Sequence, residues 1–278
     1  MSSFRKALPL ALMLLSADVF AEGFILGAGL EGDSEDGRAY TAFGDFSFSE
    51  NTWLSVFGTL AETEGIIQDN DTMLAGANID HFFGPIGVRI GGSYWGNADI
   101  LDSRDFEAAI YIRGEPGSLS LDYERRNFEF DLQSDLLRGR TVEFSADGWG
   151  LTSRAALGEN VSLFAGGMVY DYSRDLRIQP DIDVLAFISR SRLSMINNLI
   201  DHQFNGGIEF RFGLRSLDLT AGEWQTAIDG GRINSFSVGF LTPLGDRFDG
   251  EFRLSFDNSE FYGRTTAFSF YLYYFGGS

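Results

Sequence analysis

Apolar and polar side chains alternate along several stretches of this chain with a period of two, and only a β-strand turns that pattern into two opposite faces. The clearest stretches are residues 24–30, 40–48, 106–113, 203–212 and 248–257. In the last of them, apolar residues such as Phe252 and Leu254 alternate with charged residues such as Glu251 and Arg253. One face of each strand is therefore apolar and the other is polar. A soluble β-sandwich also alternates, so this pattern alone does not decide between water and lipid.

The connections between these stretches are of two kinds. Short turn sequences occur at residues 49–51, 84–87, 115–118, 158–160, 213–216 and 243–246. The other connections, most of them rich in Asp, Glu, Asn and Gly, occur at residues 31–37, 62–71, 97–103, 132–139, 176–200, 229–232 and 258–263. Together they join fourteen strands and place all short turns at one end, as in bacterial transmembrane barrels. We therefore expect an all-β fold, a transmembrane antiparallel up-and-down β-barrel of fourteen strands, with twelve as the alternative.

Three of the expected strands carry a weaker pattern, because both of their faces are partly apolar. They lie near residues 52–60, 161–172 and 214–227. The alternation also slips near residues 125–127 and 147–149. Such a slip indicates either a β-bulge, which inserts one extra residue into a strand, or a strand top that extends beyond the membrane.

The start of the chain predicts export. A positive charge at residues 5–6 precedes an apolar run at residues 7–15, and Ala21 ends a small-x-small cleavage sequence. These features are typical of a secretory signal peptide, and the apolar run is too short for a membrane-spanning helix. We expect residues 1–21 to be removed and residues 22–278 to form a single barrel domain.

Composition favours many short strands joined by tight turns, because the chain contains 34 Gly, 27 Phe and 10 Tyr. It has no cysteine, which excludes disulfide bonds and thiol chemistry. After residue 21 it keeps 19 arginines, no lysine and 39 acidic residues, a net charge of −20. A protein this acidic repels nucleic acid, so we expect no nucleic-acid partner.

The last expected strand is rich in aromatic residues, which are Phe268, Phe270, Tyr271, Tyr273, Tyr274 and Phe275. With the export signal and the alternating strands, it resembles the bacterial outer-membrane β-barrel superfamily, whose C-terminal strand is read by the barrel-assembly machinery. Residues 276–278 follow the aromatic end here, a small departure from that pattern. In length and strand count the chain is similar to the monomeric fourteen-strand porins. The resemblance implies a location in the bacterial outer membrane, in contact with lipid and lipopolysaccharide, and leaves the oligomeric state open.

The sequence around the two histidines does not favour catalysis. Outer-membrane phospholipases resemble this chain in size, and their pattern places a serine two residues after the histidine. Here Phe83 follows His81 and Phe204 follows His202 at that distance. We therefore expect no enzyme activity and no catalytic residues, with a lipid-modifying barrel enzyme as the least favoured alternative.

One connection contains Glu31, Asp33, Glu35 and Asp36, whose oxygens could hold a divalent cation. The ligand spacing of a calcium-binding loop is missing, so we expect an outer loop exposed to solvent. The sequence thus predicts no metal site and no cofactor. Other outer connections repeat the acidic bias, and the outer mouth of the barrel should therefore be negative.

In a membrane barrel the charged strand faces must line the lumen, because an arginine that faces lipid at mid-depth costs about 2–4 kcal/mol. The residues expected to face the lumen are Asp45, Arg89, Glu107, Arg113, Asp122, Glu124, Glu143, Asp147, Glu209, Arg211, Asp218, Asp249, Glu251, Arg253 and Asp257. Eleven of these are acidic and four are arginines, a net charge of −7. Most should form structural pairs across strands rather than a dedicated substrate site. Charges in an aqueous lumen nevertheless set its selectivity.

The connection at residues 176–200 differs from the others because it is long and apolar. Its apolar residues at helical spacing are Val184, Phe187, Ile188, Met195 and Leu199. Since an exposed apolar helix is unfavourable, the segment is predicted to fold into the mouth of the barrel and narrow it. The arginines of this constriction loop would be Arg177, Arg190 and Arg192. An extension of two strands, or a short helix on the rim, is the alternative.

These features together predict an outer-membrane channel for passive diffusion of small hydrophilic solutes or ions, with a preference for cations. A fourteen-strand barrel is wide enough to hold water, unlike eight-strand barrels that side chains fill. The alternative is a structural or surface-interaction barrel with an occluded lumen. The sequence does not distinguish an open lumen from a plugged one, and it does not name a solute.

Overall fold

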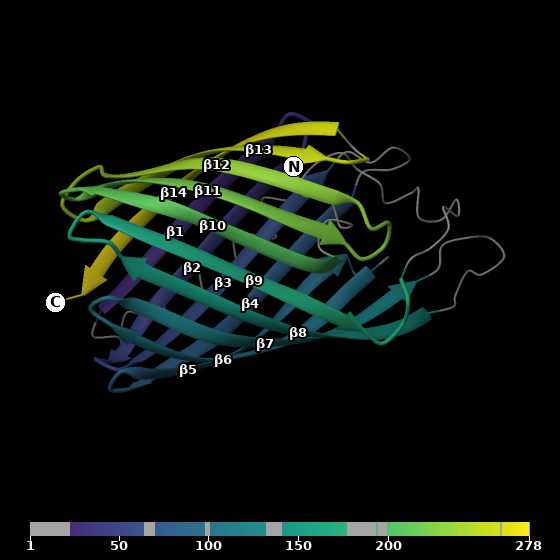
Figure 1. Cartoon of the computed structure of the whole chain (residues 1–278), viewed down its shortest axis with the longest axis horizontal. Helices are drawn as coiled ribbons and strands as arrows, with labels where there is room; N and C mark the ends of the chain where they lie inside the picture. Colours follow the sequence, from purple (N-terminus) through teal and green to yellow (C-terminus); the bar gives the residue numbers. More distant parts are fainter. Residues whose placement is uncertain are drawn as a thin grey trace.

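The structure is a computed structural model that describes residues 23–63, 70–97, 101–131, 141–176, 193, 199–261 and 263–277. The predicted signal peptide and the arginines Arg177, Arg190 and Arg192 lie outside these residues. In the described part of the chain fourteen strands form one closed antiparallel barrel (Figure 1). The strands are β1 (Gly23–Asp33), β2 (Arg38–Ser49), β3 (Thr52–Thr63), β4 (Asn70–Phe83), β5 (Ile86–Asn97), β6 (Leu101–Gly114), β7 (Gly117–Asp131), β8 (Thr141–Ala156), β9 (Val161–Tyr172), β10 (Ile200–Phe212), β11 (Arg215–Thr226), β12 (Arg232–Pro243), β13 (Phe248–Ser259) and β14 (Gly263–Gly277). The prediction of fourteen strands is confirmed.

Every strand pairs with its neighbours in chain order, and the first strand pairs with the last. The β1–β14 register runs from Gly23 opposite Gly277 to Asp33 opposite Ala267. This closure leaves no free sheet edge, so the backbone polar groups of the strands are satisfied without water. The aromatic-rich C-terminal strand is therefore the one that closes the barrel.

The three strands with a weak sequence pattern all form, as β3, β9 and β11. Where the alternation slips, the β7–β8 register runs from Gly117 opposite Ala155 to Asp131 opposite Thr141 without a shift. The slip is therefore not a bulge. These strands are 15 and 16 residues long, and the slip marks the level at which their outer face becomes polar.

Large apolar side chains cover the outside of the barrel. Phe106 and Ile110 on β6 are 46% and 53% exposed, and Phe252 on β13 lies opposite Phe240 and Phe270 on the same face. Such a surface is unfavourable in water by about 25 cal/mol per Å² of apolar area, so this outer band faces lipid. In the described ranges no helix is long and apolar enough to cross a membrane.

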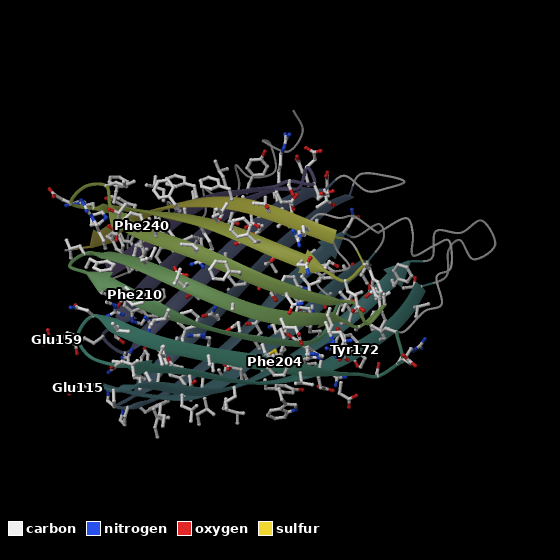
Figure 2. All side chains as sticks on the ribbon, turned by 45° about the horizontal axis from the view of Figure 1, so that its top comes forward. Glu115, Glu159, Tyr172, Phe204, Phe210 and Phe240 are labelled. Carbon is white, nitrogen blue, oxygen red and sulfur yellow. The ribbon has the colours of Figure 1, made fainter. Side chains whose placement is uncertain are left out.

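Short turns gather at one end of the barrel. Figure 2 shows Glu115 and Glu159 at this end, whereas Tyr172 lies toward the other. Gly84 and Gly213 stand in these turns with φ angles of 71° and 66°, in the left-handed region that favours glycine. The two kinds of connection are thus sorted between the two ends as the sequence predicts.

Candidate functional site

The charged faces of the strands line the inside of the barrel. Arg253 on β13 reaches Asp218 on β11 across Gly239 of the intervening strand, a contact that only the concave side of the wall permits. The strand registers carry this orientation around the barrel. They place thirteen of the predicted lumen residues on the inner face, namely Asp45, Arg89, Glu107, Arg113, Asp122, Glu124, Glu209, Arg211, Asp218, Asp249, Glu251, Arg253 and Asp257.

Glu143 and Asp147 differ from the prediction, because both lie on the outer face of β8. Asp147 is opposite Arg125 in the β7–β8 register and forms an ion pair with it at 2.7 Å. Two residues along each strand, Tyr123 and Trp149 contact each other on the outside, with ring centroids 4.9 Å apart. The prediction was wrong here because the apolar band ends at this level, and above it both faces of a strand are polar.

Four further charged residues that were not predicted to face the lumen also lie on the inner face, namely Asp80, Asp105, Arg126 and Arg154. Asp105 and Arg126 continue the phase of predicted lumen residues on the same strands, so extending each strand by two residues would have found them. With nine of the predicted acids and four predicted arginines, these four residues give eleven acids and six arginines. The resulting net charge of the inner face is −5, before acids at the outer rim are counted.

Toward the short-turn end, ion pairs hold four of the lumen arginines. Arg253 donates to both carboxylate oxygens of Asp218, at 2.9 and 3.1 Å, and to Glu251 at 2.9 Å. Tyr273 donates to the other carboxylate oxygen of Glu251 at 2.6 Å. Charge-assisted bonds of this kind are short and directional, so this guanidinium is fixed along the wall.

The same arrangement recurs on neighbouring strands. Arg89 on β5 donates to Asp80 on β4 at 3.0 Å. Arg154 on β8 and Arg211 on β10 both donate to Glu209, Arg211 at 2.6 Å. Each of these four arginines therefore has a carboxylate partner, whereas Arg113 lies over the ring of Phe82, 3.4 Å from its centroid.

In the outer half of the barrel one arginine is buried. Arg126 on β7 lies 3.3 Å from Asp105 and 3.6 Å from Glu124, and its side chain is 7% exposed. Tyr170 on β9 donates to Glu124 at 2.5 Å. Since a buried charge is tolerated only when it is paired, this network ties β6, β7 and β9 together.

An apolar cluster packs beside the buried arginine at the inner face. Its buried residues are Trp95, Leu101, Phe128, Ala146, Tyr170 and Leu199. Phe128 stacks on Phe144 with ring centroids 4.7 Å apart. Leu199, the last residue but one of the segment predicted to fold into the mouth, is 3% exposed. The other apolar residues of that prediction, Val184, Phe187, Ile188 and Met195, lie outside the described residues.

Elsewhere, aromatic side chains of the inner face lie flat on the wall. The ring of Phe43 covers Gly27, and the ring of Tyr271 covers Gly29. A Cβ at either glycine would overlap the ring, so these aromatic residues need a glycine beside them. Rings that lie on the wall leave the space of the lumen free.

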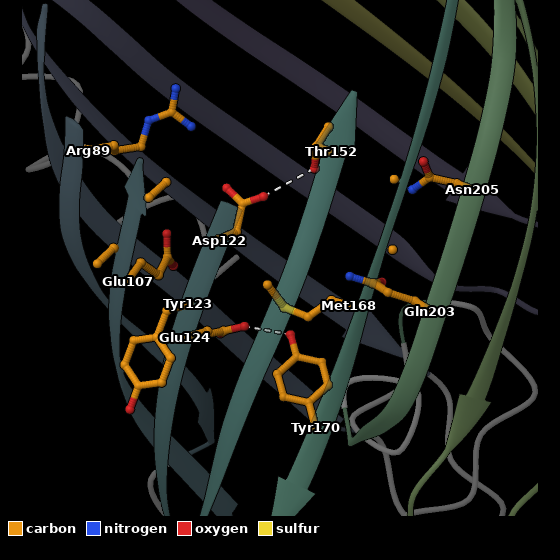
Figure 3. Close-up of a pocket in the computed structure, with 14 residues that line it drawn as sticks. Arg89, Glu107, Asp122, Tyr123, Glu124, Thr152, Met168, Tyr170, Gln203 and Asn205 are labelled. Carbon is orange, nitrogen blue, oxygen red and sulfur yellow. Dashed lines mark hydrogen bonds between the residues drawn. The ribbon is translucent and has the colours of Figure 1, made fainter. Parts of the chain in front are cut away.

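A hollow of about 390 Å³ opens in the inner wall over strands β5–β10. Glu107, Asp122 and Glu124 stand on one side of it, and Gln203 and Asn205 on the other (Figure 3). Arg89, Thr152, Gly166, Met168 and Tyr170 are also among its lining residues. A small solute could be held in this hollow.

Neither histidine contributes to this hollow. His81 lies 2.8 Å from the hydroxyl of Thr52 and packs against Phe83, and His202 lies 2.9 Å from Asp201. In the described part of the chain, neither has a serine among its hydrogen-bond partners. No group of three His, Cys, Asp or Glu residues in the described ranges could hold a metal ion.

The acidic connection after β1 is organised as a turn. The Asp33 carboxylate accepts the backbone N–H groups of Glu35 at 2.9 Å and Gly37 at 3.0 Å. Asp36 occupies the left-handed region with a φ of 61°. Asp33 therefore acts as a turn-forming residue of the kind expected for aspartate in loops.

The closed barrel, with its apolar outer band and charged inner face, confirms the fold that the resemblance to outer-membrane β-barrels predicts. No protein-family model and no curated protein match the sequence.

Three solved structures show the same fold. The monoaromatic hydrocarbon channel CymD is similar with a TM-score of 0.56 and 9% identity, over 96% of this chain and 92% of that chain. The anion-selective porin from Comamonas acidovorans has a TM-score of 0.51 and 10% identity, over 91% and 98%. The outer-membrane expressed OmpT of Vibrio cholerae has a TM-score of 0.51 and 7% identity, over 92% and 98%. At these identities the likeness concerns the fold alone.

Proposed function

We propose that the chain is an outer-membrane channel for passive diffusion of small hydrophilic solutes and ions, with a preference for cations. The observation that carries this proposal is the charged inner face, on which acids are in excess over arginines. An aqueous lumen with this bias concentrates cations and excludes anions. The aromatic rings that lie flat on wall glycines support a lumen that is open to water.

The ion selectivity of this barrel depends on its own lumen charges and does not follow from the fold. Of the similar solved structures, one is described as a hydrocarbon channel and another as an anion-selective porin. The same fold thus serves different solutes, as expected when function resides in a site and not in the fold. In this barrel most of the lumen arginines, Arg89, Arg154 and Arg253 among them, are paired with carboxylates, and the surplus charge is negative.

The second candidate is a structural or surface-interaction barrel with an occluded lumen. The buried cluster around Arg126 and Phe128 favours it, because this cluster fills part of the inner face in the outer half. A third role, as a lipid-modifying enzyme, would need a serine nucleophile next to a histidine. We propose lipid, lipopolysaccharide and the barrel-assembly machinery as the partners of the outer face, and no catalytic role.

Conductance of purified protein in planar lipid bilayers separates the first two candidates. An open lumen predicts stable single-channel steps in KCl, together with uptake of small neutral sugars by proteoliposomes. An occluded barrel that is correctly folded, as judged by heat-modifiable mobility on a gel, would show neither.

A further inference from the structure

The hollow over β5–β10 has a floor without projecting side chains. Gly166 on β9 contributes no side chain, and the methyl group of Met168 lies over Gly150 of β8. A Cβ atom added at Gly166 would lie 3.3 Å from the hydroxyl oxygen of Thr152 and 3.5 Å from the side-chain oxygen of Asn205. The wall therefore recedes at this point and leaves a space of about 390 Å³.

Hydroxyl groups hold all three carboxylates on one side of the hollow. Glu124 accepts a hydrogen bond from Tyr170 at 2.5 Å. Asp122 accepts hydrogen bonds from Ser120 at 2.8 Å and Thr152 at 3.2 Å. Glu107 accepts one from Ser93 at 3.4 Å. These partners orient the carboxylates but do not neutralise them.

The arginines near the hollow already form ion pairs with carboxylates. Arg89 lines it but donates to Asp80, which lies outside the lining. Arg126 lies 3.6 Å from Glu124 but is shared with Asp105. These two arginines face five carboxylates, which are Asp80, Asp105, Glu107, Asp122 and Glu124. Three negative charges remain uncompensated around this part of the lumen.

The other side of the hollow offers neutral hydrogen-bonding groups. Gln203 and Asn205 project from β10 toward the hollow (Figure 3). Their amides make no side-chain hydrogen bond within the described structure, so both can donate to and accept from a solute. The hollow thus presents carboxylates on one side and free amides on the other, across a floor made by Met168 and Gly166.

We propose that this hollow is a binding subsite for a small organic cation that carries hydroxyl groups, of the size of an amino sugar. The ammonium group binds between Glu107 and Asp122, and the hydroxyl groups bind Gln203 and Asn205. An anion of the same size is repelled by the carboxylates, and a neutral sugar lacks the charge-assisted bonds. The subsite deepens the proposed function, and it rests on it because a solute reaches the hollow through the lumen.

The probes that test this subsite are glucosamine, glucose and glucuronate, which share a ring and differ in charge. Each is added to the full-length mature protein in a planar bilayer at 0.1 M KCl, where charges are screened beyond about 10 Å. We expect glucosamine to block the K⁺ current at a concentration about tenfold lower than glucose, and glucuronate to have no effect.

Substitutions test whether glucosamine blocks the current from within the hollow. Asp122→Asn and Glu107→Gln should each raise the blocking concentration of glucosamine several-fold while glucose is unaffected. Asp249→Asn removes one lumen carboxylate outside the hollow and should keep the block. Gly166→Val fills the floor without a change of charge, and it should weaken the block by glucosamine. Heat-modifiable mobility shows that each variant is folded.

The outcomes separate this subsite from the channel itself. Equal block by glucosamine and glucose in a conducting channel overturns the subsite and leaves the channel intact. Equal effects of Asp122→Asn and Asp249→Asn overturn its location. If the protein does not conduct, the proposed function fails, and the subsite is tested by calorimetric titration of the detergent-solubilised barrel with glucosamine. The subsite is overturned if the unchanged protein and Asp122→Asn give the same heat of binding.

Discussion

Replacing Arg126 by methionine removes the cation that pairs with both Asp105 and Glu124. Methionine replaces the aliphatic stem of arginine, whereas the contacts of the guanidinium with the rings of Trp95 and Phe128, 5.6 and 4.9 Å from the ring centroids, are lost together with the charge. The two carboxylates lose their partner, although Asp105 keeps its hydrogen bond from Ser103 and Glu124 keeps the one from Tyr170. The variant therefore tests the buried ion network rather than packing.

The expected loss of stability follows from the burial of the Arg126–Asp105 pair. The side chains of Arg126 and Asp105 are 7% and 4% exposed, so the pair belongs to the class of buried ion pairs. Removing one partner of such a pair costs about 3–5 kcal/mol, because an unpaired charge stays buried. We expect the free energy of unfolding of Arg126→Met to fall by about this amount. Urea titration of the barrel folded into lipid vesicles, followed by tryptophan fluorescence, measures it.

An arginine on the outer face of the neighbouring strand β6 provides a matched control. Arg104 on β6 lies 3.8 Å from Glu129 and is 71% exposed, and exposed pairs contribute about 0–1 kcal/mol. Arg104→Met should therefore have little effect on unfolding. Adding Asp105→Asn to Arg126→Met should recover part of the lost stability, since one unpaired charge is removed. Equal stability of Arg126→Met and Arg104→Met would refute the reasoning that Arg126 is buried and paired.

Three further predictions concern the faces of the barrel and its mouth. Spin labels at Ile110 and Phe252 should be quenched by lipid-soluble oxygen, and labels at Glu107 and Glu251 by aqueous reagents; the reverse pattern would contradict the orientation of the strands. Asp218→Asn/Glu251→Gln frees the guanidinium of Arg253, so the permeability ratio of K⁺ to Cl⁻ should fall, and an unchanged ratio would show that these groups do not face the conducting path. Deleting residues 183–198 should raise single-channel conductance with little loss of barrel stability, because Leu199 stays packed on the wall; unchanged conductance would place the segment outside the pore.

The strand pattern and most of the lumen could be predicted from the sequence because a closed barrel has one lipid face and one water face. A charged residue in phase with Glu251 has nowhere to point but inward at the level of the apolar band. That argument fails where the band ends, which is why Glu143 and Asp147 were assigned to the lumen. Above the band, water is present on both faces and alternation no longer tells inside from outside.

The hollow could not be predicted, because the features that form it leave no periodic signal. Gly166 and Gly150 read as ordinary barrel glycines, and Gln203 and Asn205 read as polar residues of an inner face. Gln203 and Asn205 line the same hollow as Asp122 only because of the registers of four consecutive strands, β7 to β10. Likewise, nothing in the sequence around Arg126 indicates that it is buried, since its partner Asp105 comes from a neighbouring strand and Tyr170 from one beyond.

The reversal potential of the channel in a KCl gradient tests the central claim most directly. Acids exceed arginines on the inner face, so K⁺ should permeate better than Cl⁻ at 0.1 M salt. The preference should decline toward 1 M salt, where the screening length falls from about 10 Å to about 3 Å. A reversal potential that indicates anion preference at low salt, or no preference at any salt concentration, would contradict the account.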